Sequence, residues 1–172
     1  ARYGGTRGLI TKEYKIETNI DNSFDGLKIV HFSDLHYLRI TNKETTKNII
    51  KEINILNPDI VVFTGNLIDK DYNPTNTDIN DLKELLLSIK SKYGKYSVIG
   101  NNDNKIRETI EDIYTNSNFI LLNNDYDIIY GNNNDKLFIG GLDTYSYDKS
   151  DIDKVMTYFT DNEDINYKII LV

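Results

Sequence analysis

The 172-residue chain contains no cysteine, and this absence excludes disulfide bonds and thiolate metal sites. It also has no apolar run approaching the ~20 residues that a membrane-spanning helix needs. Basic residues are too few to offset the acidic ones, 20 against 27, so the net charge is −7. An acidic chain of this kind is a poor partner for a phosphate backbone, and we expect no nucleic-acid binding.

Several common hydrolase and nucleotide-binding motifs are missing as well. No Gly-x-x-x-x-Gly-Lys-Ser/Thr loop occurs, and no Gly-x-Gly-x-x-Gly follows a predicted strand. No Gly-x-Ser-x-Gly elbow marks a serine hydrolase. Histidine is scarce, because the chain has only His31 and His36.

The residues that are present have an ordinary globular composition, with 39% hydrophobic and 27% charged residues. The length suits one domain with a real core, and we predict a single domain over residues 1–172. Residues 1–11 form a leader arm in this prediction. Residues 12–20 alternate polar and apolar side chains, a pattern typical of an edge strand.

Strand and helix patterns alternate in the first two thirds of the chain. We predict strands at 27–33, 60–64 and 96–99. We predict helices at 42–56, across 79–89 with its end near 93, and at 105–116. Asn42 is the predicted N-cap of the first helix. A β-α-β-α-β-α order implies an α/β fold with a parallel sheet and right-handed crossovers.

The pattern of predicted elements changes in the last third of the chain. Short strands are predicted at 119–122, 127–130 and 137–139, joined by turns rich in Asn, Asp and Gly, as a meander that packs a further sheet beside the first. A short helix at 152–159 then leads to a buried strand at 167–172. Because the chain stops inside this apolar strand, we expect either a fragment of a longer protein or a proteolytic cut after residue 172.

Polar side chains follow three consecutive predicted strands. They are Asp34 and His36, then Asn66 and Asp69, then Asn101, Asn102 and Asp103. Ligands gather at the carboxyl ends of parallel strands, so these clusters are expected to converge. Gly65 and Gly100 precede two of them and would leave room for sharp turns. We predict a metal or phosphate site here, and ordinary polar loops are the alternative.

The first cluster has the strongest chemistry. In extended geometry, residues two apart point to the same side, so Asp34 and His36 would aim a carboxylate and an imidazole at one point. That pair suits Zn, Mn or Fe better than Ca. His31 would face the other way and is predicted to be a hydrogen-bonded structural histidine. Asp69 either caps its loop or supports a ligand.

The three motifs together resemble those of the calcineurin-type metallophosphoesterases. The motifs are Asp34-Leu35-His36, Gly65-Asn66-Leu67-Ile68-Asp69 and Gly100-Asn101-Asn102-Asp103, in the family's order, and the resemblance covers about residues 27–143. It implies an α/β/β/α sandwich with mixed sheets. It also implies a hydrolase with two divalent ions, Mn, Zn or Fe, roughly 3.5–4 Å apart.

The resemblance also implies roles for individual residues. Asp34 and His36 would hold the first ion, residue 66 would bridge both ions, and Asn101 would hold the second. Residue 102 would approach the phosphate, and Asp103 would orient residue 102. Tyr145 and Tyr147 are expected to be packing or rim residues rather than substrate contacts.

Two positions depart from the family pattern. Asn66 stands where the family has a bridging aspartate, and Asn102 stands where it has a histidine. An amide offers one neutral oxygen and an NH2 that repels a cation, so we expect the ions to be only partly bound. The family's later histidines are absent, and we expect them beyond Val172.

The expected activity is hydrolysis of a phosphate monoester, diester or pyrophosphate in a small molecule or lipid. A non-catalytic binding or scaffold module of the same fold is the alternative. The most similar subgroup is bacterial and often membrane-anchored, so we expect an anchor upstream of Ala1, and a cytoplasmic location otherwise.

Overall fold

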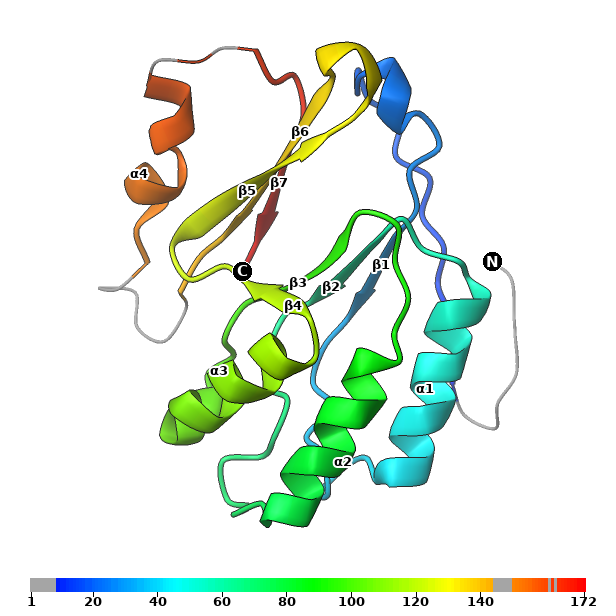
Figure 1. Cartoon of the computed structure of the whole chain (residues 1–172), viewed down its shortest axis with the longest axis vertical. Helices are drawn as coiled ribbons and strands as arrows, with labels where there is room; N and C mark the ends of the chain where they lie inside the picture. Colours follow the sequence, from blue (N-terminus) through cyan, green and yellow to red (C-terminus); the bar gives the residue numbers. More distant parts are fainter. Residues whose placement is uncertain (1–8, 144–149, 161, 163) are drawn as a thin grey trace.

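The computed structural model describes residues 9–143, 150–160, 162 and 164–172 (Figure 1). Its first sheet has four parallel strands in the order β1-β2-β3-β4. Their bounds are Ile29–Phe32 for β1, Ile60–Phe63 for β2, Gly94–Ser97 for β3 and Phe119–Leu121 for β4. The predicted α/β fold with a parallel sheet is therefore confirmed.

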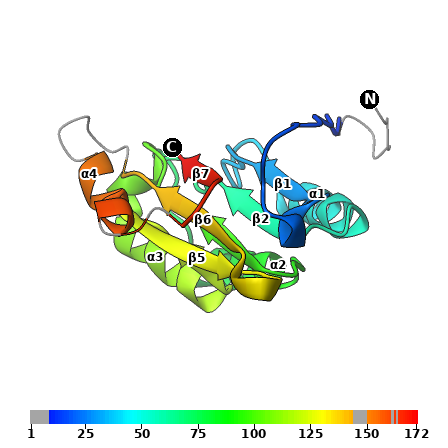
Figure 2. The ribbon, with the colours of Figure 1, turned by 90° about the horizontal axis from the view of Figure 1, so that it is seen from above.

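Three helices cover one face of this sheet (Figures 1 and 2). They are α1 (Lys43–Ile55), α2 (Asn76–Leu87) and α3 (Arg107–Asn116). The predicted cap of α1 is confirmed, since the Asn42 side chain accepts a hydrogen bond from the backbone N–H of Thr45 at 2.8 Å. A capping box between Thr75 and Asp78 begins α2.

A second, mixed sheet covers the other face. It has the order β5-β6-β7, with β5 at Asp125–Tyr130, β6 at Lys136–Gly141 and β7 at Lys168–Leu171. The short helix α4 (Ile152–Val155) lies on its outer side (Figure 1). The described part of the chain also contains short 3-10 helices at Asn22–Phe24, Asp103–Ile106, Asn132–Asn134 and Thr157–Thr160.

Three hydrophobic clusters hold the layers together. The first lies between the helices and the first sheet, around Phe63 and Ile110. The second lies between the two sheets, around Val62 and Ile139, and the third fills the space between the second sheet and α4, around Phe138. All four residues of β2 are buried, as its continuous apolar run predicts. The layers form the expected α/β/β/α sandwich.

Residues 12–20 form no strand, and that prediction was wrong. Tyr14 and Ile16 are 78% and 71% exposed, so the alternating pattern finds no neighbouring strand in the described part of the chain. The segment lies at the β1 edge of the molecule in both views (Figures 1 and 2).

The last third also differs from a simple meander. β4 joins the first sheet in parallel with β3, and β7 pairs in parallel with β6, so within the described residues only β5 and β6 form an antiparallel pair. The strand at 167–172 was predicted to be buried, yet Lys168 is exposed and Ile169 and Ile170 are only partly buried, because β7 lies at the edge of the described sheet.

The second helix ends at Leu87 rather than near residue 93. Ser88 closes it by donating its hydroxyl to the Leu85 carbonyl at 2.6 Å. The Asn54 side chain of α1 then bridges the following loop, accepting from the Lys90 N–H and donating to the Ser88 carbonyl. Ile89 is buried in that loop, which explains why it fits the helical pattern.

Candidate functional site

The loops after β1, β2 and β3 meet at the carboxyl ends of these strands. The first two loops are joined by their backbones: the N–H of Asp34 donates to the Gly65 carbonyl, and the N–H of His36 donates to the Asn66 carbonyl, both at 3.0 Å. The predicted convergence of polar strand ends therefore holds for the first two clusters. The third cluster joins them through glycine and Asp103.

Two glycines allow the second and third loops to touch. A Cβ on Gly65 would lie 2.3 Å from the Gly100 nitrogen, and a Cβ on Gly100 would lie 2.3 Å from the Asn66 nitrogen. Gly65 also has φ +88°, in the left-handed region that side chains rarely adopt. The room that these glycines were predicted to leave is occupied by the neighbouring loop's backbone.

Asp103 clamps the second loop to the third. Its Oδ2 accepts from the backbone N–H groups of Asn66 and Gly100 at 2.8 and 3.0 Å, and its Oδ1 accepts from that of Leu67 at 2.8 Å. Burial raises the pKa of Asp103, while these amide donors lower it. The resemblance predicted that Asp103 orients residue 102, whereas its carboxylate contacts backbone amides and positions both loops.

Asn66 lies at the centre of the three loops. Its Nδ2 donates to Asp34 Oδ1 at 2.7 Å, and its Oδ1 accepts from both the backbone N–H and the Nδ2 of Asn102 at 3.0 Å. These partners fix the orientation of the amide, because a carboxylate only accepts and a backbone N–H only donates. A neutral amide network therefore connects Asp34 with Asn102.

Asp34 and His36 lie together, but not for the predicted reason. β1 ends at Phe32, and the two residues have φ values of 55° and 39°, so the backbone is left-handed rather than extended. Asp34 Oδ1 lies 3.6 Å from His36 Nε2, and the Asp34 side chain is 55% exposed. The Ser33 hydroxyl and then the Asn66 amide lower the pKa of Asp34; burial opposes them, and the nearby His36 adds a smaller lowering effect.

A second carboxylate supports His36 from behind. Asp69 Oδ2 lies 3.1 Å from His36 Nδ1, and Asp69 Oδ1 accepts from the Asp71 N–H at 3.0 Å and from Arg39 Nη1 at 2.6 Å. Asp69 thus both caps its loop and contacts the imidazole. The Asp71 N–H, then Arg39, lower the pKa of Asp69. Sequence reasoning missed Arg39, whose only signal was a basic residue shortly after His36.

The other predicted residues lie outside this network. Asn101 is exposed and makes no side-chain hydrogen bond within the described residues. His31 Nε2 lies 2.8 Å from the Thr64 hydroxyl, which confirms a hydrogen-bonded histidine. Tyr145 and Tyr147 lie outside the described residues.

The donor set fits one metal ion only in part. Asp34 Oδ1 and His36 Nε2 face one another at a spacing that one ion with ligand distances of about 2.0–2.2 Å could bridge. Within the described ranges, no three His, Asp or Glu side chains form a group that could hold an ion. Asn66 stands where a carboxylate would bridge two ions, but it presents an NH2 group to Asp34, so the residues do not fit a two-ion cluster.

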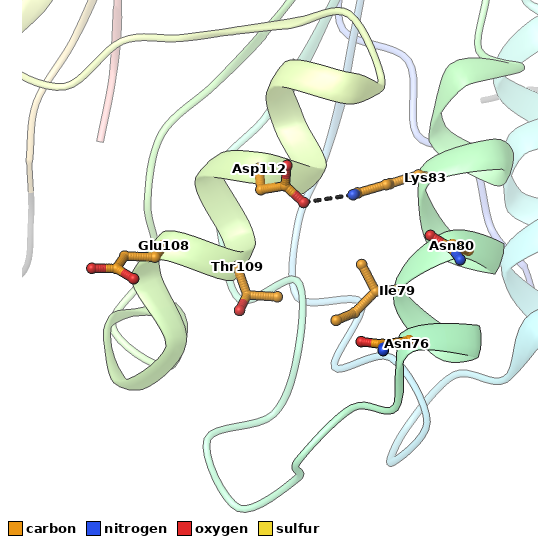
Figure 3. Close-up of a pocket in the computed structure, with 7 residues that line it drawn as sticks. All are labelled: Asn76, Ile79, Asn80, Lys83, Glu108, Thr109 and Asp112. Carbon is orange, nitrogen blue, oxygen red and sulfur yellow. Dashed lines mark ion pairs between the residues drawn. The ribbon is translucent and has the colours of Figure 1, made fainter.

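A groove of about 420 Å³ lies elsewhere, between α2 and α3 (Figure 3). An ion pair between Lys83 and Asp112 crosses it at 2.5 Å. None of its lining residues belongs to the three loops. Among the described residues, no helix has the length and apolar character needed to cross a bilayer.

Comparison with known proteins places these motifs in context. The family model described as calcineurin-like phosphoesterase matches residues 27–170. The chain is 31% identical over 165 residues to the uncharacterized metallophosphoesterase YkuE of Bacillus subtilis, covering 94% of this chain and 57% of that protein. It therefore spans little more than half the length of this relative.

Two further relatives carry more specific names. Over 78 residues the chain is 36% identical to the UDP-2,3-diacylglucosamine pyrophosphatase LpxG of Chlamydia muridarum, covering 45% of this chain and 23% of that protein. Over 95 residues it is 31% identical to a transmembrane protein with metallophosphoesterase domain from Danio rerio, covering 55% of this chain and 21% of that protein.

Proposed function

Since the chain belongs to the calcineurin-like phosphoesterase family, we propose that its three strand-end loops form a metal-dependent phosphoesterase site weakened by Asn66 and Asn102. The reaction is hydrolysis of a phosphate monoester, diester or pyrophosphate. The hydrogen-bonded series from Asp34 through Asn66 to Asn102 carries this proposal, because it joins one residue from each loop.

Each residue has a definite part in the proposed site. Asp34 and His36 would hold one divalent ion of the Mn, Zn or Fe type, and Asp69 holds the imidazole in place. A bound ion supplies Lewis-acid stabilisation and lowers the pKa of a bound water. The Asn102 amide can donate a hydrogen bond to a phosphoryl oxygen, but it cannot protonate a leaving group as a histidine would. Weak activity is the expected consequence.

Two relatives support particular candidates for the substrate and the location. The relative named as a UDP-2,3-diacylglucosamine pyrophosphatase supports a pyrophosphate linked to a lipid as one candidate. The relative named as a transmembrane protein supports membrane association of the whole protein. A lipid-linked pyrophosphate and a membrane location are therefore the substrate and the location to test first.

The direct test is turnover of bis-p-nitrophenyl phosphate and p-nitrophenyl phosphate with Mn²⁺, Zn²⁺ or Fe²⁺. We expect slow metal-dependent turnover, and a gain of roughly 10- to 100-fold for Asn66→Asp because a charged ligand is restored. The double variant with Asn102→His should gain further. Asn80→Asp is the matched control, since Asn80 is exposed on α2 and should leave turnover unchanged.

One observation favours a second candidate, a non-catalytic binding module. The Asn66 amide satisfies Asp34 and Asn102 without any ion, so the three loops can assemble metal-free. Absence of turnover with every metal, even in the double variant, would support the binding module and contradict the phosphoesterase.

A further inference from the structure

Arg39 occupies an unusual place beside the site. It follows His36 by three residues, and its backbone N–H donates to the His36 carbonyl at 3.0 Å, so the chain turns back on itself. The turn brings Arg39 Nη1 to 2.6 Å from Asp69 Oδ1, while the other oxygen of Asp69 lies 3.1 Å from His36 Nδ1. One buried carboxylate therefore contacts both the guanidinium and the imidazole.

We propose that Arg39 is a positioning residue that acts through Asp69 to hold His36 in the Nδ1–H tautomer, with Nε2 turned toward Asp34. The binding of an ion by His36 Nε2 rests on the proposed function. The tautomer itself does not, because it is a property of the metal-free protein.

The hydrogen-bond chemistry sets the tautomer. A carboxylate can only accept, so the 3.1 Å contact is a hydrogen bond only when Nδ1 carries the proton. Nε2 lies 3.6 Å from Asp34 Oδ1, beyond hydrogen-bond distance, and needs no proton there. A neutral imidazole with Nδ1–H leaves the Nε2 lone pair available to a cation.

Arg39 is the group that holds Asp69 in the required orientation. Asp69 Oδ1 accepts from Arg39 and from the Asp71 N–H, which fixes the rotation of the carboxylate and aims Oδ2 at the imidazole. Among the residues that the structure describes, one other cationic side chain bonds to this loop: Lys105, which donates to the Lys70 carbonyl instead. Without Arg39, one backbone N–H alone would restrain Oδ1.

An ordinary surface ion pair is the competing explanation, because the Arg39 side chain is 57% exposed. Lys43 and Asp81 provide a matched pair of that kind, at 2.8 Å with Lys43 60% exposed and no contact with histidine. A surface pair predicts the same small effect for both cations. The positioning role predicts an effect on His36 for Arg39 only.

The test uses long-range ¹H–¹⁵N spectra of the two imidazoles in the metal-free protein at about pH 8.5, above the ordinary titration range of histidine. We expect His36 in the Nδ1–H tautomer. Arg39→Gln should shift His36 toward a mixture of tautomers and weaken Zn²⁺ binding, measured by calorimetry, about tenfold. His31, bonded to Thr64, is the internal reference and should not change.

Three variants complete the test. Arg39→Lys should preserve the tautomer, since one N–H donor at the Nη1 position suffices. Lys43→Gln should change neither readout. If Arg39→Gln fails to fold, Asp69→Asn should give the same tautomer mixture, because it removes the carboxylate that Arg39 orients toward His36.

The proposal is overturned if His36 in the unmodified protein carries its proton on Nε2, or if Arg39→Gln leaves the tautomer unchanged. A tautomer shift in a protein that binds no Zn²⁺ would uphold the positioning role and count against the proposed function. The two conclusions are therefore separable.

Discussion

Replacing Asn66 by aspartate restores a carboxylate at the centre of the three loops and tests what the amide does there. In the present protein the Asn66 Nδ2 donates to Asp34 Oδ1 at 2.7 Å. The variant loses this hydrogen bond to a charged acceptor and sets two carboxylates side by side. Without metal, the folded state should therefore be less stable than that of the unmodified protein.

The magnitude follows from two contributions. A hydrogen bond to a charged group contributes about 1.5–3 kcal/mol. Two like charges about 4 Å apart repel by about 4 kcal/mol at an effective dielectric constant of about 20 and about 1 kcal/mol in water. Because the Asp34 side chain is 55% exposed, the lower repulsion applies. A total near 3 kcal/mol lowers Tm by roughly 6–12 °C for a domain of this size.

Calorimetric unfolding in EDTA and in Mn²⁺ measures this effect. A divalent ion that binds the variant's folded state should restore about 2.7 kcal/mol of stability at a concentration of about 100 times Kd. The unmodified protein should respond little to either addition, and the Asn80→Asp control should behave like it. If Asn66→Asp is as stable in EDTA as the unmodified protein, or if Mn²⁺ raises both Tm values equally, the structural role given to the amide is wrong.

Three other changes probe the framework of the site. Gly65→Ala should lower the free energy of unfolding, measured with urea, by more than about 2 kcal/mol, because its Cβ would lie 2.3 Å from the Gly100 nitrogen. Gly26→Ala is the control: Gly26 has φ +74° but open space around it, so the loss should be only about 1 kcal/mol. Asp103→Asn should lower the free energy of unfolding by about 2–4 kcal/mol in the same measurement, since an amide cannot accept from all the backbone N–H groups that bond to the Asp103 carboxylate. An unchanged urea midpoint would contradict the role of Asp103 in joining the two loops. Burial lowers the pKa of Lys95 to about 8, so the folded state releases this proton more readily than the unfolded chain. Stability should therefore rise between about pH 8 and 10.4, by up to about 3 kcal/mol, and Lys95→Met should abolish that rise.

The features that depend on local sequence or on sheet topology were predictable. The Asn42 cap is local, and the buried run of β2 follows from its composition. The meeting of the three polar clusters follows from parallel strands in sequence order, because their carboxyl ends share one edge. The prediction of a strand at residues 12–20 was wrong because an alternating pattern favours a strand but does not provide a neighbouring strand to pair with.

The interior of the site was less predictable. The proximity of Asp34 and His36 was expected from extended geometry, yet it arises from a left-handed turn held by the carbonyls of the second loop. The contact of Asp69 with both His36 and Arg39 depends on the same turn. Periodicity describes regular elements only, so such irregular backbone leaves no pattern in the sequence.

The claim that the metal site is weakened is tested most directly by adding metal to protein prepared without it and counting the ions that bind. Calorimetric titration with Mn²⁺ or Zn²⁺ should show at most one weakly bound ion per chain, lost in His36→Ala, because Asp34 and His36 provide the fitting donors and the Asn66 amide takes the bridging position. Two tightly bound ions per chain would contradict a weakened site.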